Sequence, residues 1–320
     1  MLNFALTGLA GYIAPRHLEA IHATGNRLVA ALDVHDSVGV VDGFFPAAAF
    51  FTEYERFDRH LEKLRRGPVE DRVDVVAVCT PNHLHDAHAR LALRVGADAI
   101  CEKPLVLNPW NLDGLEELEL EFGRRVWTVL QLRVHPALVA LKARLDADPG
   151  QRHHVRLTYV TRRGRWYRYS WKGDEAKSGG IATNIGVHFF DLVQWLFGAA
   201  RGHAVHLRDA TRAAGTLDLL NADVEWFLSL DAADLPVPGP PPTYRSITVD
   251  GEEVEFSGGF ADLHTRVYER TLAGTGFGLA EARPAIELVH AIRHAPLASP
   301  AGGAHPYVVA RSRSAEASAA

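Results

Sequence analysis

The sequence predicts an α/β domain built on a parallel sheet, followed by an α+β domain with an open, mostly antiparallel sheet and flanking helices. In the first 130 or so positions, short apolar runs alternate with segments of helical spacing, which is typical of parallel strands joined by crossover helices. After about residue 150, runs with period-two alternation follow one another with few helical segments between them, which indicates antiparallel strands. We expect a first domain over residues 1–127, a second over 128–296 and a poorly ordered tail over 297–320.

The composition suits a folded chain that binds a small molecule. Of the 320 residues 47% are hydrophobic, and 34 Lys and Arg against 39 Asp and Glu give a formal net charge of −5. Such a chain can bury a large core, and it lacks the positive excess that nucleic acid or an anionic membrane would require. Cys79 and Cys101 lie in apolar runs as packed thiols, and the apolar start of the chain is too short for a signal or a membrane span. These features predict a cytoplasmic protein.

The elements of the first domain follow from apolar runs and their spacing. Strands are expected at Asn3–Thr7, Arg27–Leu32, Val73–Cys79, Ala97–Cys101 and Val126–Leu132, and helices at Pro15–Thr24 and Leu84–Val95. The third and fourth runs are continuously apolar, which is typical of strands buried on both faces of a parallel sheet.

A glycine turn separates the first strand from the first helix. Its residues include Gly8, Gly11, Tyr12, Ile13 and Ala14. Asp33 ends the second strand, 25 positions after Gly8. Glycines at such a turn let the backbone approach a pyrophosphate, and an acid after the second strand accepts hydrogen bonds from the adenosine ribose. The order predicts a Rossmann domain although two residues, not one, separate the glycines, and a carboxylate at this place favours NAD over NADP.

Two further strands end in polar residues. Thr80, Pro81, Asn82 and His85 follow the third strand, and Glu102 and Lys103 follow the fourth. Ligands of open α/β sheets bind off the carboxyl ends of the strands, so Lys103 is expected beside the cofactor. A solvated helix start is the alternative for His85 and its neighbours.

Together these motifs resemble the glucose-fructose oxidoreductase/inositol dehydrogenase (Gfo/Idh/MocA) family. The resemblance is carried by the glycine turn, Asp33, the Thr80-Pro81-Asn82-x-x-His85 stretch and the Glu102-Lys103-Pro104 tripeptide. It implies that the first stretch lies along the nicotinamide and its ribose and that Lys103 sits by the reacting hydroxyl. Glu102 and Gln131 complete the predicted cofactor contacts.

A glycine-rich segment of the second domain matches the same family. Gly179, Gly180, Gly186, His188 and Asp191 fit the family pattern, whereas Asn184 stands where many relatives have Asp. An amide cannot act as a carboxylate base, so within the predicted catalytic group Asn184 only donates or accepts hydrogen bonds. Proton transfer then falls to Lys103 or His188, between which the sequence does not choose. A packed core histidine is the alternative for His188.

Cations and aromatic residues are interleaved between positions 161 and 173. Arginine forks match carboxylate or diphosphate groups, and aromatic faces stack on a base or a sugar, which favours an anionic, ring-bearing substrate. Single-stranded nucleic acid and an ordinary exposed loop are the alternatives. The predicted substrate contacts are Arg162, Arg163, Trp166, Tyr167 and Lys172, with Asn184, His188 and Arg133.

Almost the whole chain, to about Arg293, resembles one subgroup of the family, the UDP-N-acetylglucosaminuronate 3-dehydrogenases of bacterial surface-polysaccharide pathways. The stretches that carry this resemblance are 11–17, 131–133, 170–173 and 183–190. It implies NAD-dependent oxidation of the C3 hydroxyl of a UDP-sugar, a homotetramer and, in some relatives, 2-oxoglutarate as acceptor for NADH. A dehydrogenase of a free sugar or inositol and a non-catalytic dinucleotide-binding regulator are the alternatives.

The 17 histidines do not predict a metal site. No histidine, cysteine and carboxylate grouping has metal-ligand spacing along the sequence, and His83, His85 and His88 come closest. We therefore expect no metal.

Overall fold

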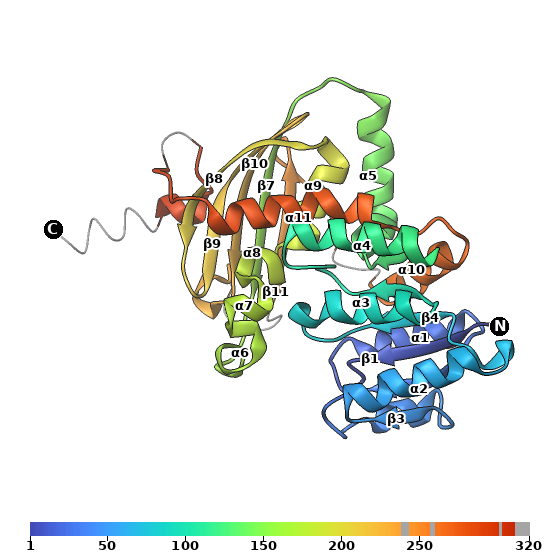
Figure 1. Ribbon diagram of the computed structural model, residues 1–320. Helices are drawn as coiled ribbons and strands as arrows, with labels where there is room; N and C mark the ends of the chain where they lie inside the picture. The colour runs from blue at the N-terminus through green and yellow to red at the C-terminus, as the bar shows by residue number, and fades with distance from the viewer. Residues whose placement is uncertain (238–242, 257–259, 301–302, 311–320) are drawn as a thin grey trace. The chain divides into compact units, whose positions relative to one another are not determined.

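The computed structural model describes residues 1–237, 243–256, 260–300 and 303–310, and the chain forms two compact units (Figure 1). Unit 1 comprises residues 1–134 and 260–283, and unit 2 comprises residues 135–259 and 284–320. The division differs from the predicted one after residue 127 in two ways. Residues 128–134 stay with unit 1, and the segment 260–283 returns to it because Leu263, Val267 and Tyr268 join its core.

Unit 1 is a parallel six-stranded sheet with the order β3-β2-β1-β4-β5-β6. Its elements are β1 Asn3–Thr7, α1 Ala14–Ala23, β2 Arg27–Leu32, η1 Gly39–Gly43, β3 Ala49–Phe51, α2 Tyr54–Arg66, η2 Val69–Asp71, β4 Val75–Val78, η3 Asn82–Leu84, α3 His85–Arg94, β5 Asp98–Cys101, α4 Pro109–Phe122, β6 Val126–Thr128, η4 Gln131–Val134 and α10 Leu263–Leu272. The strand order reverses between β1 and β4, which makes the carboxyl ends of these strands the topological switch point. The predicted Rossmann domain is confirmed.

Some elements of unit 1 differ from the sequence prediction. The last strand ends at Thr128 rather than Leu132, because residues 131–134 form the short helix η4. The strand β3 was not predicted, because its three residues are fewer than the four to eight that indicate a strand.

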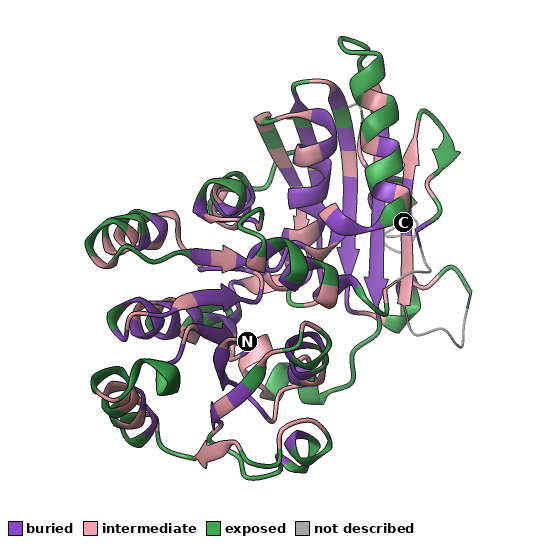
Figure 2. Ribbon diagram, turned by 90° about the vertical axis from the view of Figure 1, so that its right-hand side faces the viewer, coloured by how far each residue is buried: buried purple, intermediate pink, exposed green. Residues whose placement is uncertain are grey.

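Alternation along β1 builds the core of unit 1. Phe4 and Leu6 lie in one apolar cluster with Leu18 and Ile21 of α1, which are one helical turn apart, and with Tyr268 of α10. All five are fully buried, and burial of each such side chain contributes roughly 1.5–3 kcal/mol. Figure 2 shows the strands of this unit as mostly buried. The segment containing α10 is therefore held by the same core that supports the switch point.

Unit 2 contains a second six-stranded sheet, with the order β12-β11-β7-β10-β9-β8. Its elements are α5 Pro136–Ala147, β7 His153–Thr161, α6 Trp166–Tyr169, η5 Trp171–Gly173, α7 Glu175–Ser178, α8 Gly180–Asn184, α9 Val187–Phe197, β8 Ala200–Arg208, β9 Arg212–Leu219, β10 Ala222–Ser229, η6 Ala232–Asp234, β11 Thr243–Val249 and β12 Glu252–Glu253, while α11 Leu279–His294 runs across the boundary between the units. The pairings are antiparallel except β7 with β10, which are parallel. The chain between β7 and β10 includes helices, as a parallel crossover requires. The predicted open, mostly antiparallel sheet is confirmed.

The two faces of this sheet are covered by different parts of unit 2. Tyr159 of β7 packs on Phe189 of α9, with ring centroids 4.8 Å apart. The next residue back, Thr158, points to the other face, where its hydroxyl lies 2.9 Å from Nε2 of His305. His305 is 1% exposed and stacks on Phe227.

The packing of His305 corrects the predicted tail. Residues 303–310 lie against the sheet rather than in a poorly ordered tail, because His305, Tyr307 and Val308 supply apolar and aromatic surface to the cluster around Phe227. Leu297 also bridges to Val205 of β8. The rest of the predicted tail, residues 301–302 and 311–320, lies outside the described residues.

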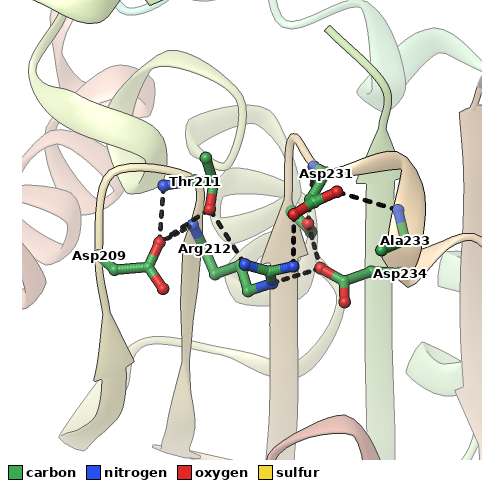
Figure 3. Close-up of polar contacts among 7 residues, drawn as sticks. Asp209, Thr211, Arg212, Asp231, Ala233 and Asp234 are labelled. Carbon is green, nitrogen blue, oxygen red and sulfur yellow. Dashed lines mark hydrogen bonds and ion pairs between the residues drawn. The ribbon is translucent and has the colours of Figure 1, made fainter.

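A buried ion-pair network closes the ends of β9 and β10 (Figure 3). Arg212 donates from Nε to Asp234 at 2.5 Å and from Nη2 to Asp231 at 2.6 Å, and Ser229 donates to the same Asp234 oxygen. The adjacent Leu230 accepts the backbone N–H of Arg163 at 3.1 Å. The network thus fixes the end of β10. The loop at residues 161–173, here called the basic and aromatic loop, is hydrogen-bonded there through Arg163.

Both cysteines are free and buried, as predicted. Burial raises the pKa of Cys79 and Cys101 well above the ordinary value, so both remain packed thiols. None of the helices in the described part of the chain has the length and apolar character to cross a membrane.

Candidate functional site

The glycine turn of unit 1 lies directly against the end of β4. Gly8 has a φ of +87°, and a Cβ there would come 2.6 Å from the carbonyl carbon of Cys79. A Cβ at Gly11 would come 2.9 Å from the Gly8 oxygen. Only glycine allows this contact at Gly8, and the turn leads straight into the N-terminus of α1, whose helix dipole favours an anion such as phosphate. Tyr12 projects from the turn and is 98% exposed.

Asp33 is tied to the same turn. One carboxylate oxygen accepts the N–H of Ala10 at 2.8 Å, and the other accepts the N–H of His35 at 2.9 Å. Each carboxylate oxygen has a second lone pair, so the group can still accept hydrogen bonds from ribose hydroxyls. The placement is the one the sequence predicts for an NAD-selecting acid.

Two buried polar atoms in the segments that follow β4 and β6 fit a bound dinucleotide. Within the described residues, Oγ1 of Thr80 and Oε1 of Gln131 have no hydrogen-bond partner. Buried polar atoms are normally paired, so such atoms are expected where a ligand supplies the partner. Together with the turn at Gly8 and the carboxylate of Asp33, they make the residues of unit 1 suitable for NAD.

His85 links two loops beside this region. Its Nδ1 lies 2.7 Å from the carbonyl oxygen of Pro104, and its Nε2 lies 2.8 Å from that of Thr80. The side chain is 1% exposed, and burial lowers its pKa. The alternative of a solvated helix start is therefore wrong. A neutral ring has one N–H, so His85 donates to one of these two carbonyls and only contacts the other. Its predicted contact with the cofactor stays a prediction.

Lys103 follows β5, on the edge of the sheet where β1 and β4 also end. The preceding Glu102 is buried, and its Oε1 lies 3.0 Å from Nε2 of His17 and 2.9 Å from Nε2 of His264. The other carboxylate oxygen accepts the N–H of Lys103 at 3.3 Å. Burial alone would raise the pKa of Glu102, but the two histidine hydrogen bonds outweigh it and hold that pKa well below its ordinary value. Lys103 is thus anchored at its backbone by an ionised, buried carboxylate.

The sequence does not reveal this cluster. His17 and His264 are 85 and 162 positions from Glu102, so no local spacing connects the three. Among the described residues these three form a group whose ligand atoms all lie within 4.8 Å of one another, close enough for a metal ion. The contacts already have hydrogen-bond lengths, and the hydroxyl of Tyr268 lies 2.7 Å from Nδ1 of His17.

In unit 2 the predicted catalytic segment packs tightly on the sheet. A Cβ at Gly186 would come 2.5 Å from the Ala182 oxygen and 2.6 Å from the Leu228 side chain, so α8 and α9 meet β10 more closely than another residue would allow. His188 lies in the first turn of α9, with its ring 6.0 Å from that of Tyr159. His188 is partly buried, and a packed core histidine stays the alternative to its predicted catalytic role.

Asn184 meets the basic and aromatic loop. Its amide nitrogen donates to the hydroxyl oxygen of Tyr167 at 2.6 Å, and Tyr167 is 4% exposed. Burial raises the pKa of Tyr167, so its hydroxyl stays protonated at neutral pH. The structure therefore brings together two residues that the sequence assigns to the substrate site.

The remaining substrate candidates differ in their surroundings. Arg162, Arg163 and Trp166 are exposed, whereas the ammonium of Lys172 lies 4.1 Å from the ring centre of Trp171. Arg133 belongs to unit 1, where it donates to the carbonyl of Glu281 at 3.2 Å. The loop thus presents four arginines, Arg162, Arg163, Arg165 and Arg168, and an aromatic face to solvent, and the substrate role of each candidate stays a prediction.

A Rossmann unit with a carboxylate and a lysine at the strand ends, joined to an α+β unit with a histidine on a glycine-rich helix, defines a two-domain nicotinamide-dependent oxidoreductase. The chain belongs to the Gfo/Idh/MocA oxidoreductase family. The model of that family's NAD-binding Rossmann fold matches residues 2–129, and that of its C-terminal alpha/beta domain matches residues 152–226.

Among solved structures, the chain is similar to the WlbA (WbpB) dehydrogenase from Thermus thermophilus in complex with NAD and UDP-GlcNAcA. The two are 58% identical over 96% of this chain and 100% of that one, with a TM-score of 0.92. The same enzyme in complex with NAD and alpha-ketoglutarate gives a TM-score of 0.91.

Curated relatives match over shorter stretches. Inositol 2-dehydrogenase 1 of Saccharopolyspora erythraea is 31% identical over 152 residues, which cover 45% of this chain and 42% of that protein. D-glucoside 3-dehydrogenase of Escherichia coli is 28% identical over 130 residues, which cover 39% of this chain and 36% of that protein. The chain matches less than half the length of these relatives.

Proposed function

We propose that the protein oxidises the C3 hydroxyl of UDP-N-acetyl-D-glucosaminuronate to the 3-keto sugar, with NAD as oxidant. The observation that carries this proposal is the 58% identity, over 96% of the chain, to the Thermus thermophilus enzyme crystallised with NAD and UDP-GlcNAcA. The C3–H bond breaks with transfer of hydride to the cofactor, and the hydroxyl proton passes to a base, so the products are the ketone, NADH and a proton.

The residues of unit 1 hold and orient the cofactor. NAD, when bound, supplies the hydride acceptor. The glycine turn from Gly8 and the N-terminus of α1 bind the pyrophosphate, and Asp33 binds the adenosine ribose and repels a 2′-phosphate. Thr80, Asn82 and Gln131 lie just after strand ends. They contact the nicotinamide and its ribose, as the family resemblance implies.

Lys103 of unit 1 and His188 of unit 2 are the two candidates for accepting the hydroxyl proton. Both are nitrogen bases of the kinds used for proton transfer, and neither is fully buried. Asn184 cannot take a proton from the sugar, and its hydrogen bond to Tyr167 fits a role in binding.

The exposed arginines of unit 2 suit the nucleotide part of the substrate. Arg162 and Arg163 can each form paired hydrogen bonds with a diphosphate or a carboxylate, and UDP-N-acetylglucosaminuronate carries both groups. Trp166 offers a face for stacking on the base.

Three finer points extend the proposal. The Thermus enzyme was crystallised with alpha-ketoglutarate, which supports 2-oxoglutarate as the acceptor that regenerates NAD in this protein. The product of the proposed reaction is a 3-keto nucleotide sugar, which fits surface-polysaccharide synthesis in the cytoplasm. We also propose a homotetramer, which mass photometry would test.

Mass spectrometry of the sugar product after incubation with NAD and UDP-N-acetylglucosaminuronate tests the reaction. A loss of two hydrogens, with isotope exchange at the positions next to C3, is the expected result.

Lys103→Met and His188→Asn, measured separately by NADH absorbance, test the base, and near-wild-type turnover in both would refute the assignment. NADH formation with inositol or a free sugar alone would favour the rival dehydrogenase, and none with any sugar would favour a binding protein without catalysis.

A further inference from the structure

Two buried histidines from distant parts of the chain meet at the carboxylate next to Lys103. His17 is on α1 and His264 is on α10, and both lie in unit 1 with Glu102. The exposed fractions are 0% for His17, 7% for His264 and 6% for Glu102. A buried carboxylate is costly unless it is hydrogen-bonded, so these contacts are a condition for Glu102 to occupy this place.

The proton positions in the cluster follow from the donors available. An ionised carboxylate only accepts, so Nε2 of His17 and Nε2 of His264 both donate to Oε1 of Glu102. Nδ1 of His17 then carries no proton and accepts from the hydroxyl of Tyr268 at 2.7 Å. Burial lowers the pKa of His17, which keeps the ring neutral. The chain of bonds from Tyr268 through His17 to Glu102 is satisfied at every step.

The turn that carries Lys103 is held on both sides. Before it, the second oxygen of Glu102 accepts the N–H of Lys103 itself. After it, the Pro104 carbonyl lies against Nδ1 of His85. A rotation of the Glu102 carboxylate would therefore remove a hydrogen bond that holds the N–H of Lys103.

We propose that His17 and His264 are positioning residues for Lys103, acting through the Glu102 carboxylate. The inference rests on the proposed function, in which Lys103 is one of the two candidates for accepting the hydroxyl proton. A displacement of about 1 Å at a reacting group can cost about 100-fold in rate, so loss of one of these hydrogen bonds lowers turnover without removing a substrate contact.

The distances favour hydrogen bonds over a metal ion at this cluster. Two ligand atoms that share a tetrahedral zinc ion at about 2.0–2.1 Å lie about 3.3 Å apart. The two contacts to Glu102, at 3.0 and 2.9 Å, are shorter than that and match N–H···O bonds.

Substitution of His264 gives the sharpest test, because one variant removes its donor and another keeps a donor. His264→Leu is expected to lower kcat at least about 10-fold with KM for UDP-N-acetylglucosaminuronate and NAD changed less than about twofold. His264→Gln retains an N–H and is expected to recover most of that loss. His22→Leu, an exposed histidine on α1, serves as the matched control and keeps wild-type kcat. A His264→Leu enzyme with wild-type kcat, or a Gln variant as slow as the Leu variant, would overturn the proposal.

Hydrogen–deuterium exchange tests the same idea without turnover. In His264→Leu the amides of residues 102–106 are expected to exchange at least about 10-fold faster, while β1 and β4 keep wild-type protection. Faster exchange throughout unit 1 would show general destabilisation and would count against positioning. If the wild-type protein makes no NADH with the UDP-sugar, the proposed function fails, and the exchange result still decides whether the turn is held by His264. Stoichiometric zinc in the purified protein that is lost in His264→Leu would overturn the hydrogen-bonding role.

Discussion

The amide nitrogen of Asn184 lies 2.6 Å from the hydroxyl oxygen of Tyr167, and this bond joins the glycine-rich helical segment to the basic and aromatic loop. Tyr167 is buried, so the bond ties a buried residue of the loop to the segment that precedes α9. In the proposed function the loop binds the nucleotide and the helix carries a catalytic candidate. The pair therefore sets how these two parts of the site in unit 2 lie relative to each other.

Two replacements of Asn184 test its hydrogen bond to Tyr167, because one removes the bond and the other retains an acceptor for the tyrosine hydroxyl. Asn184→Leu leaves the buried Tyr167 hydroxyl without this partner and is expected to lower the free energy of unfolding by about 1–3 kcal/mol and to raise KM for the UDP-sugar. Asn184→Asp can accept from the same hydroxyl and should keep most of the stability. Urea denaturation and initial rates measure both effects, and equal stability of the Leu variant and wild type would contradict this account.

Asp33 accepts the N–H of Ala10 and, in the proposed function, also selects NAD, and two substitutions distinguish these roles. Asp33→Asn keeps an oxygen that accepts the Ala10 N–H but removes the charge that repels a 2′-phosphate. We expect its preference for NAD over NADP, measured as the ratio of kcat/KM values, to fall at least about 10-fold. Asp33→Ala also loses the tie and should raise KM for NAD further. Unchanged discrimination in Asp33→Asn would show that another group excludes NADP.

Arg212 has two carboxylate partners of different exposure, which predicts different costs. Asp234 is 6% exposed and Asp231 has a side chain 38% exposed. Asp234→Ala leaves the buried guanidinium with one partner fewer and should destabilise the protein by roughly 3–5 kcal/mol, whereas Asp231→Ala should cost about 1 kcal/mol or less. Thermal or urea unfolding compares the two. Equal losses would mean that the buried part of the network in Figure 3 is not the stabilising one.

The parts of the site that depend on local order could be predicted from the sequence. The glycine turn, Asp33 and Lys103 are each fixed by a position at the end of a strand, and parallel strands bring their carboxyl ends to one edge whatever their length. Gly186 was identified instead from its fit to the family pattern, and the structure explains the glycine, because a Cβ there would collide with Ala182 and Leu228.

Residues that meet through tertiary packing could not be predicted. His264 reaches Glu102 across 162 positions because residues 260–283 return to unit 1, and no periodicity records such a return. His305 gives a similar case. It lies in an alanine- and serine-rich stretch typical of disorder, yet its ring is buried against Phe227. The composition of a segment describes all its residues together, so it does not reveal that a few of them, such as His305, are buried.

Two buried histidines predict loss of stability in mild acid. Burial lowers the pKa of His88 to about 4 and that of His305 to about 3, whereas in the unfolded chain histidine titrates near 6.5. Below pH 6.5 the unfolded state therefore binds protons that the folded state does not, so the free energy of unfolding falls as the pH falls. From pH 8 to pH 5 each histidine is expected to contribute a loss of about 2 kcal/mol. Urea denaturation of His88→Gln and His305→Gln at both pH values should show a smaller loss than wild type, with the exposed His22→Gln as control. Losses equal to that of wild type in both variants would mean that other groups cause the acid sensitivity.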